Sequence, residues 1–103
     1  MTLAGPLLAL ALSAQPFPPP HVAPSTAATK CDRATVLLVD SAKGELKGTT
    51  AAGVVTFRIS QDVQVLDAAG KPAGAATGLV QGAKIRVYYV LGDGAKVQEI
   101  DLE

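Results

Sequence analysis

Residues 84–103 read KIRVYYVLGDGAKVQEIDLE, and this stretch has the composition and spacing of a β-hairpin. Valine, isoleucine and tyrosine recur at alternate positions on both sides of Asp93-Gly94, as expected for two extended segments with one buried face. An Asp-Gly pair strongly favours a two-residue loop, because a type I′ turn requires positive φ angles at both central positions. The stretch therefore predicts two antiparallel strands that meet at a tight turn.

The register of this hairpin follows from its charges. With Asp93-Gly94 as the loop, the pairs are Lys84 with Glu103, Arg86 with Asp101 and Tyr88 with Glu99 on one face, and Ile85 with Leu102 and Val87 with Ile100 on the other. A shift by one residue would place carboxylates opposite Val87 and Ile85, in the core. Burying an unpaired carboxylate costs several times more than the roughly 0.2–1 kcal/mol that a cross-strand charge pair contributes. We therefore predict this register, with the charged face solvated and charge-paired.

The residues before the hairpin show the same pattern in shorter runs. Segments rich in Val and Thr alternate with turn residues about every eight to twelve positions, which is typical of a sandwich or barrel. The segments that we expect to be strands are 34–40, 45–50, 54–60 and 62–67, followed by a single helical turn at 78–82. Asp62 and Asp67 flank the last of these strands, where aspartate commonly bonds to local backbone groups. The sequence predicts an all-β domain over residues 32–103, a small six-stranded OB-like or SH3-like antiparallel barrel.

The first part of the chain differs from this domain in composition. Residues 1–14 hold an apolar run that ends in small residues and is too short to span a bilayer as a helix. It resembles a secretory signal with cleavage after Ala14, although no Lys or Arg precedes it; an uncleaved, disordered tail is the alternative. We expect an exported protein, periplasmic or extracellular, whose mature chain has no integral membrane span.

Residues 15–31 are proline-rich and are interpreted as a disordered linker. His21, the single histidine of the chain, falls in this linker and is expected to be solvated. Cys31, the single cysteine, does not follow the small apolar residues of a lipoprotein signal, because Thr29 and Lys30 precede it. One cysteine excludes an intrachain disulfide, so we expect a free or intermolecularly paired thiol.

The domain lacks the side chains that common catalytic and metal sites need. Ser41 and Ser60 have no histidine in residues 32–103 to activate them, and zinc would require three or four Cys or His ligands. The nine basic and nine acidic residues cancel, so no bulk charge favours a nucleic acid or an anionic membrane. We expect no enzymatic activity, no cofactor and no nucleic-acid partner.

The string from Ala34 to Leu102 resembles the small secreted bacterial OB-like barrels that are grouped as a domain of unknown function. In that group a V-x-x-V-D first strand, a T-x-V after the third turn and an L-x-x-G-x-x-V-x-V entry to the fifth strand recur. The residues that match the last pattern here are Leu79, Gly82, Ile85 and Val87. The resemblance implies an OB-like fold and an exported location, and it implies no activity.

The strand layout is also similar, more distantly, to the periplasmic copper- and silver-binding barrels. The resemblance implies a soft-metal site made of Met thioethers, a His and a nearby Trp. This chain has Met1 as its only methionine, has no tryptophan, and carries His21 outside the barrel. Soft-metal binding by that mechanism is therefore not expected.

One basic strip is the candidate for ligand binding. OB-type barrels that bind nucleic acids use exposed aromatic side chains as stacking platforms on a basic face. Such a strip could be formed here by Lys47, Arg58, Lys84 and Arg86, with Tyr88 as the platform. The predicted hairpin weakens this interpretation, because Glu99, Asp101 and Glu103 neutralise the same face, and a solvated, charge-paired barrel wall is the simpler alternative.

The leading functional hypothesis is a non-catalytic binding or interaction module of the cell envelope, whose partner is an unidentified envelope protein or polymer. It is suggested by the combination of a leader-like segment, a linker and a small barrel without catalytic groups. The alternative is a purely structural envelope or extracellular domain that binds no ligand.

Overall fold

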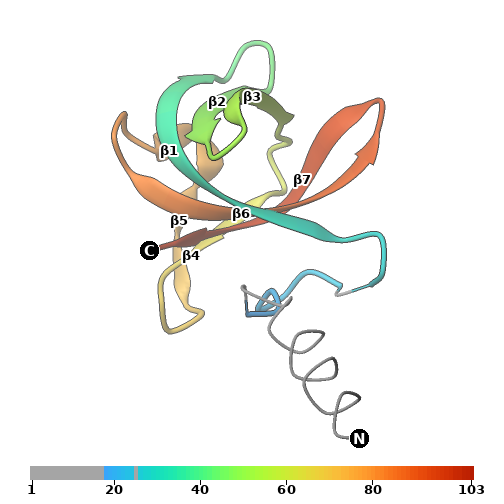
Figure 1. Cartoon of the computed structure of the whole chain (residues 1–103). Coiled ribbons are helices and arrows are strands. Elements are labelled where there is room, and N and C mark those ends of the chain that lie inside the picture. The colour runs from blue at the N-terminus through green and yellow to red at the C-terminus, as the bar shows by residue number, and fades with distance from the viewer. Residues whose placement is uncertain (1–17, 25) are drawn as a thin grey trace, which may run out of the picture.

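The longest strand, β1 (Lys30–Asp40), organises the fold because it pairs with two neighbours in succession (Figure 1). The structure is a computed structural model, and it describes residues 18–24 and 26–103. The other elements are β2 (Glu45–Thr50), β3 (Gly53–Arg58), β4 (Gln64–Leu66), β5 (Pro72–Ala75), a 3-10 turn η1 (Ala76–Gly78), β6 (Lys84–Gly92) and β7 (Gly94–Leu102). The first part of β1 runs antiparallel to β6 and the second part runs antiparallel to β2, with a bulge between Val36 and Leu38.

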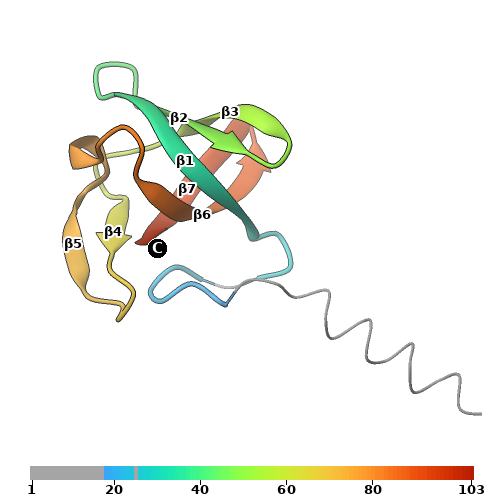
Figure 2. The same cartoon turned by 60° about the vertical axis from the view of Figure 1, so that its left-hand side comes forward.

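The sheet closes on itself. Its strand order is β3-β2-β1-β6-β7-β4-β5, and an additional parallel pairing joins β3 to β7. Five strands therefore form a barrel, while β4 lies parallel to β7 outside it and β5 pairs with β4 (Figure 2). The predicted all-β, OB-like barrel is confirmed, but the predicted number of strands is wrong. The described residues form seven strands, because Pro72–Ala75 is an additional short edge strand.

The core lies inside this barrel and consists of alternate residues of each strand. Phe57 on β3 is fully buried at its centre, and its ring meets the ring of Tyr89 edge to face with 5.3 Å between the ring centroids. The other fully buried apolar side chains include Leu46, Ile85, Val87 and Ile100, one from β2 and three from the predicted hairpin. The two apolar pairs of the hairpin thus face the core, as predicted.

The hairpin register is confirmed away from the turn and wrong next to it. Ile85 pairs with Leu102 and Tyr88 with Glu99, as predicted, but Gly92 pairs with Gly94. Asp93 alone therefore forms the tip, and a bulge after Tyr88 absorbs the shift of one residue. The predicted type I′ turn requires a positive φ at both Asp93 and Gly94. Gly94 has a φ of 91°, but no residue other than glycine has a positive φ among those described, so Asp93 does not adopt the conformation that this turn needs.

Two further boundaries differ from expectation. The helical turn lies at Ala76–Gly78 and not at 78–82. The predicted start of the domain at residue 32 lies inside β1, which begins at Lys30. The leader-like segment, residues 1–14, lies outside the described residues. Within residues 18–24 and 26–103, no helix is long and apolar enough to cross a membrane.

Candidate functional site

The structure does not gather the four candidate ligand residues into one strip. Lys47 lies on β2 and Arg58 at the end of β3, both exposed, whereas Arg86 and Tyr88 lie on β6, on the other side of β1. Only 2% of Tyr88 is exposed, so its ring is not available as a surface platform. Two other places concentrate polar side chains: the outer face of β6 and β7, and the end of the barrel beside the hairpin tip.

The outer face of β6 and β7 is covered, and the expectation of a solvated wall is wrong. Glu99 and Asp101 are both fully buried. The segment of residues 18–23 covers them, and it lies next to the turn between β4 and β5 (Figure 2). The imidazole of His21 lies against Gly70. The residues that were expected to belong to a linker thus have a defined place on the barrel, and 35% of the His21 side chain is exposed.

Glu99 is the main attachment point of this segment. One carboxylate oxygen, Oε2, accepts the backbone N–H of His21 at 2.7 Å; the other, Oε1, accepts those of Val22 at 2.7 Å and Ala23 at 2.9 Å. Burial by itself would raise the pKa of Glu99, but the interaction with Asp101 and the three N–H donors lower that pKa below its usual 4.5. Glu99 therefore stays ionised and holds three consecutive backbone groups.

Asp101 lies beside Glu99 and is far less well satisfied. Neither of its oxygens has a hydrogen-bond partner among the described residues. Two nitrogen atoms approach it: Nε2 of His21 lies 3.6 Å from Oδ2, and Nη2 of Arg86 lies 3.5 Å from Oδ2. Burial, followed by the neighbouring Glu99 carboxyl, raises the pKa of Asp101 to about 6. One proton is thus retained by this carboxyl pair under mildly acidic conditions.

The pair predicts a maximum of stability in mild acid. Because the pKa of Asp101 rises from 3.8 to about 6 on folding, its contribution to the free energy of unfolding is fully present below about pH 4. That contribution is lost as the pH rises from about 4 to 6, by at most about 3 kcal/mol. Because the pKa of Glu99 is lowered on folding, its contribution to the free energy of unfolding is present above pH 4.5 and is lost as the pH falls below that value. We therefore expect the urea midpoint to peak near pH 4–4.5 and to fall between about pH 4.5 and 6.

The predicted fall of the urea midpoint with rising pH can be tested with a specific control variant. The groups that face Asp101 are Glu99 on β7, Arg86 on β6 and His21 on the covering segment. The variant Asp101→Asn cannot ionise, so its urea midpoint should change little between pH 5 and 7. A wild-type midpoint that rises over that range would contradict the assignment.

Cys31 and Tyr88 pair across β1 and β6 at the edge of this covered face. The Tyr88 hydroxyl donates to the carbonyl oxygen of Pro18 at 2.7 Å, which fixes the far end of the covering segment. Burial raises the pKa of the Cys31 thiol to about 11, so the thiol is protonated at neutral pH and is a weak nucleophile. Tyr88 thus anchors the covering segment, and the Cys31 thiol beside it is unreactive at neutral pH.

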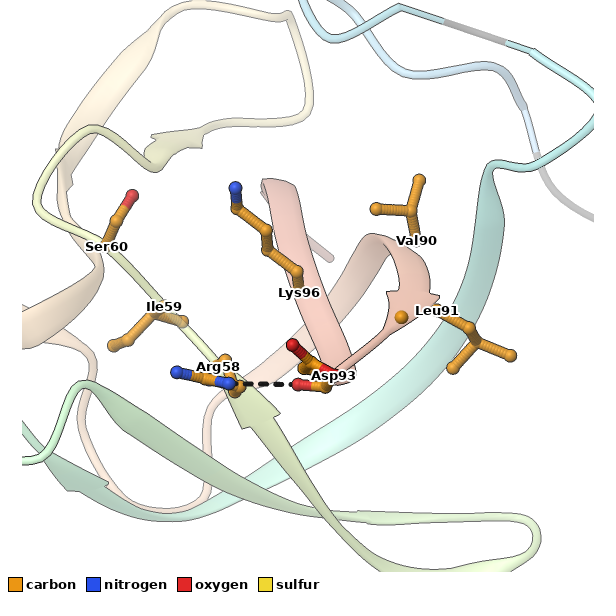
Figure 3. A pocket seen from close by; sticks show the side chains of 8 residues that line it. Arg58, Ile59, Ser60, Val90, Leu91, Asp93 and Lys96 are labelled. Atoms are coloured by element: carbon orange, nitrogen blue, oxygen red, sulfur yellow. Dashed lines mark hydrogen bonds between the residues drawn. The ribbon is translucent and has the colours of Figure 1, made fainter.

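A second candidate site is an open pocket at the end of the barrel, with a volume of about 380 Å³ (Figure 3). It is lined by Arg58, Ile59, Ser60, Val90, Leu91, Gly92, Asp93 and Lys96. The parallel pairing of β3 with β7 places Arg58 in register with Lys96. Arg58 donates through Nη1 to the backbone oxygen of Asp93 at 3.0 Å, as the dashed line in Figure 3 marks.

This pocket combines charge with apolar surface. Neither Arg58 nor Lys96 forms an ion pair with any residue in the described part of the chain. Leu91 leaves 65% of its surface exposed beside them. Two cations that line one pocket together with apolar side chains favour an anionic group that carries an apolar substituent. The basic strip predicted from the sequence included Arg58 and did not include Lys96, because these two residues become neighbours only when β3 closes the barrel against β7.

Comparison with known proteins bears on the fold alone. No family model matches the chain, and no curated protein is similar to it in sequence. Among solved structures, the fold resembles the crystal structure of Ag(I)CusF with a TM-score of 0.56 and 14% identity, over 73% of this chain and 97% of that one. The silver ion belongs to that protein; at this identity the likeness carries no ligand across. The chain thus has the fold of a small OB-like barrel similar to CusF.

Proposed function

We propose that this protein is exported and acts as a non-catalytic binding module of the cell envelope, periplasmic or extracellular, which recognises an anionic group on an envelope protein or polymer. The observation that carries the proposal is that Arg58 on β3 and Lys96 on β7 lie in register and line the same open, partly apolar pocket. The leader-like composition of residues 1–14 and the CusF-like fold support export and a small barrel.

The electrostatics of the pocket support an anionic ligand. Two like charges in register on neighbouring strands repel each other, which destabilises the sheet unless a counter-charge is nearby. Asp93 lines the same pocket and offsets one of them, so Arg58 and Lys96 together leave an excess positive charge. A carboxylate or phosphate would accept from the remaining donors of Arg58 and from the Lys96 ammonium, while Val90 and Leu91 would contact an apolar group beside it.

The proposal predicts binding of a short peptide that ends in leucine with a free carboxylate, and much weaker binding of the same peptide ending in an amide. We expect the double variant Arg58→Gln/Lys96→Gln to bind the free acid at least roughly tenfold more weakly, because two charge-assisted hydrogen bonds are lost. Isothermal titration calorimetry at low salt measures both affinities.

The matched control is Lys43→Gln/Lys47→Gln, which removes the same charge from the exposed end of β2 and the turn before it. This control should keep the affinity of the wild type. Equal weakening in both double variants would mean non-specific attraction. No retention of either peptide by a folded wild-type protein would favour the alternative of a structural domain without a ligand.

A further inference from the structure

The segment of residues 18–23 lies on the barrel in the way that a bound peptide would. We propose that the outer face of β6 and β7 around Glu99 and Asp101 is a second binding site, for a bent segment of a partner protein that offers three consecutive backbone N–H groups and carries a basic side chain. The chain's own residues 18–23 occupy this site in the absence of the partner. The site is separate from the hairpin pocket and uses other residues.

Glu99 recognises backbone and not side chains. A carboxylate that accepts three consecutive N–H groups requires three residues in a row that are not proline. Residues 18–24 read PPPHVAP, so His21, Val22 and Ala23 are the only residues there that can donate. Any segment that bends as residues 21–23 do and has three such residues would satisfy Glu99 in the same way.

Asp101 supplies the selectivity for a positive charge. It is fully buried, both of its oxygens lack hydrogen-bond partners among the described residues, and it faces the covering segment through His21. The imidazole comes no closer than 3.6 Å, beyond hydrogen-bonding distance. An ammonium or guanidinium group in the place of His21 would bring donors and a full charge to this carboxylate. Gly70 leaves room for it, because a Cβ there would lie 2.8 Å from Nδ1 of His21.

The covering segment can leave without breaking the sheet. Its hydrogen bonds run to the side chains of Glu99 and Tyr88, and residues 18–23 belong to no strand. Displacement would therefore exchange one set of side chain–backbone bonds for another and leave the barrel ladders intact. The partner supplies the same backbone donors and adds a charged donor for the Asp101 oxygens, which lack a hydrogen bond among the described residues.

The test uses the full chain and a synthetic peptide, PPPKVAPS, which has the sequence of residues 18–25 with lysine in the place of His21. The variant Val22→Pro removes one donor to Glu99 and opens the site; Tyr88→Phe, which loses the bond to Pro18, opens it by a second route. Fluorescence anisotropy should show that Val22→Pro binds the labelled peptide several-fold more tightly than the wild type, whose own segment competes.

Two further variants, made in the Val22→Pro background, assign the binding to the proposed residues. Glu99→Gln should weaken it on the order of tenfold, and Glu45→Gln, a matched change on β2, should leave it unchanged. Asp101→Asn should remove the preference for PPPKVAPS over a peptide with alanine at the lysine position. Circular dichroism confirms that each variant is folded. The proposal is overturned if folded Val22→Pro and Tyr88→Phe proteins bind no better than the wild type, or if Glu99→Gln binds as tightly as its parent.

Discussion

Replacing Phe57 by alanine is expected to destabilise the barrel by about 3–5 kcal/mol, as is usual for removing a fully buried phenylalanine. Phe57 has no exposed surface, packs edge to face on Tyr89, and lies on the strand that closes the barrel against β7. A domain of this size has a total stability of about 4–11 kcal/mol, so the variant should lose about a quarter or more of its free energy of unfolding. Urea unfolding followed by circular dichroism measures the loss.

The control for this change is Val54→Ala on the same strand, where 64% of the side chain is exposed. It should cost less than about 0.5 kcal/mol. Equal losses for Phe57 and Val54 would show that the interior is not closed as described, since only a buried side chain leaves a cavity when it is truncated.

The second large effect is expected for Glu99→Ala, about 2–3 kcal/mol at pH 7. Three N–H groups lose a charged acceptor, and each bond to a charged group contributes about 1.5–3 kcal/mol. The loss stays below the sum of these bonds because the segment can leave the barrel and bond to water. Removing Glu99 also relieves its repulsion of Asp101, which reduces the loss further.

Glu45→Ala is the matched control, because Glu45 is half-buried on β2 and takes no part in holding residues 18–23. The free energy of unfolding from urea titrations should fall for Glu99→Ala and stay close to the wild-type value for Glu45→Ala. An unchanged stability of Glu99→Ala would mean that the segment contributes nothing to the folded state.

The sequence predicted the hairpin well because its signals are local. The pairing of Ile85 with Leu102 and of Val87 with Ile100 follows from alternation and from the cost of burying carboxylates in the core. The exact turn did not follow, because the bulge after Tyr88 shifts the pairs near the tip by one residue. Bulges depend on how the sheet bends into a barrel, which no short stretch encodes.

The remaining differences in the fold have similar causes. Pro72–Ala75 reads PAGA, is exposed at all four positions and lacks any alternation of apolar and polar residues, so nothing in its sequence marks it as a strand. It becomes one because β4 offers it an open edge. The division of β1 between two partners also depends on tertiary structure, since the bulge at Leu37 turns the strand from β6 toward β2.

The candidate sites were harder to predict because both depend on segments that are distant in sequence. Alternation correctly placed Glu99 and Asp101 on the outer face, but it cannot show that residues 18–23 return to cover them. A partial signal existed: HVA is the only run of N–H donors among the prolines of residues 18–24. Arg58 and Lys96 meet only through the closure of β3 on β7.

Amide hydrogen exchange of His21, Val22 and Ala23, followed by NMR, tests most directly whether Glu99 holds residues 18–23 on the barrel. In the wild-type protein near pH 6, these three amides should exchange far more slowly than the exposed amides of the turns, and in Glu99→Gln the protection should be reduced by at least about tenfold. Exchange of the same amides at the rate of an unstructured peptide in the folded wild-type protein would contradict the account.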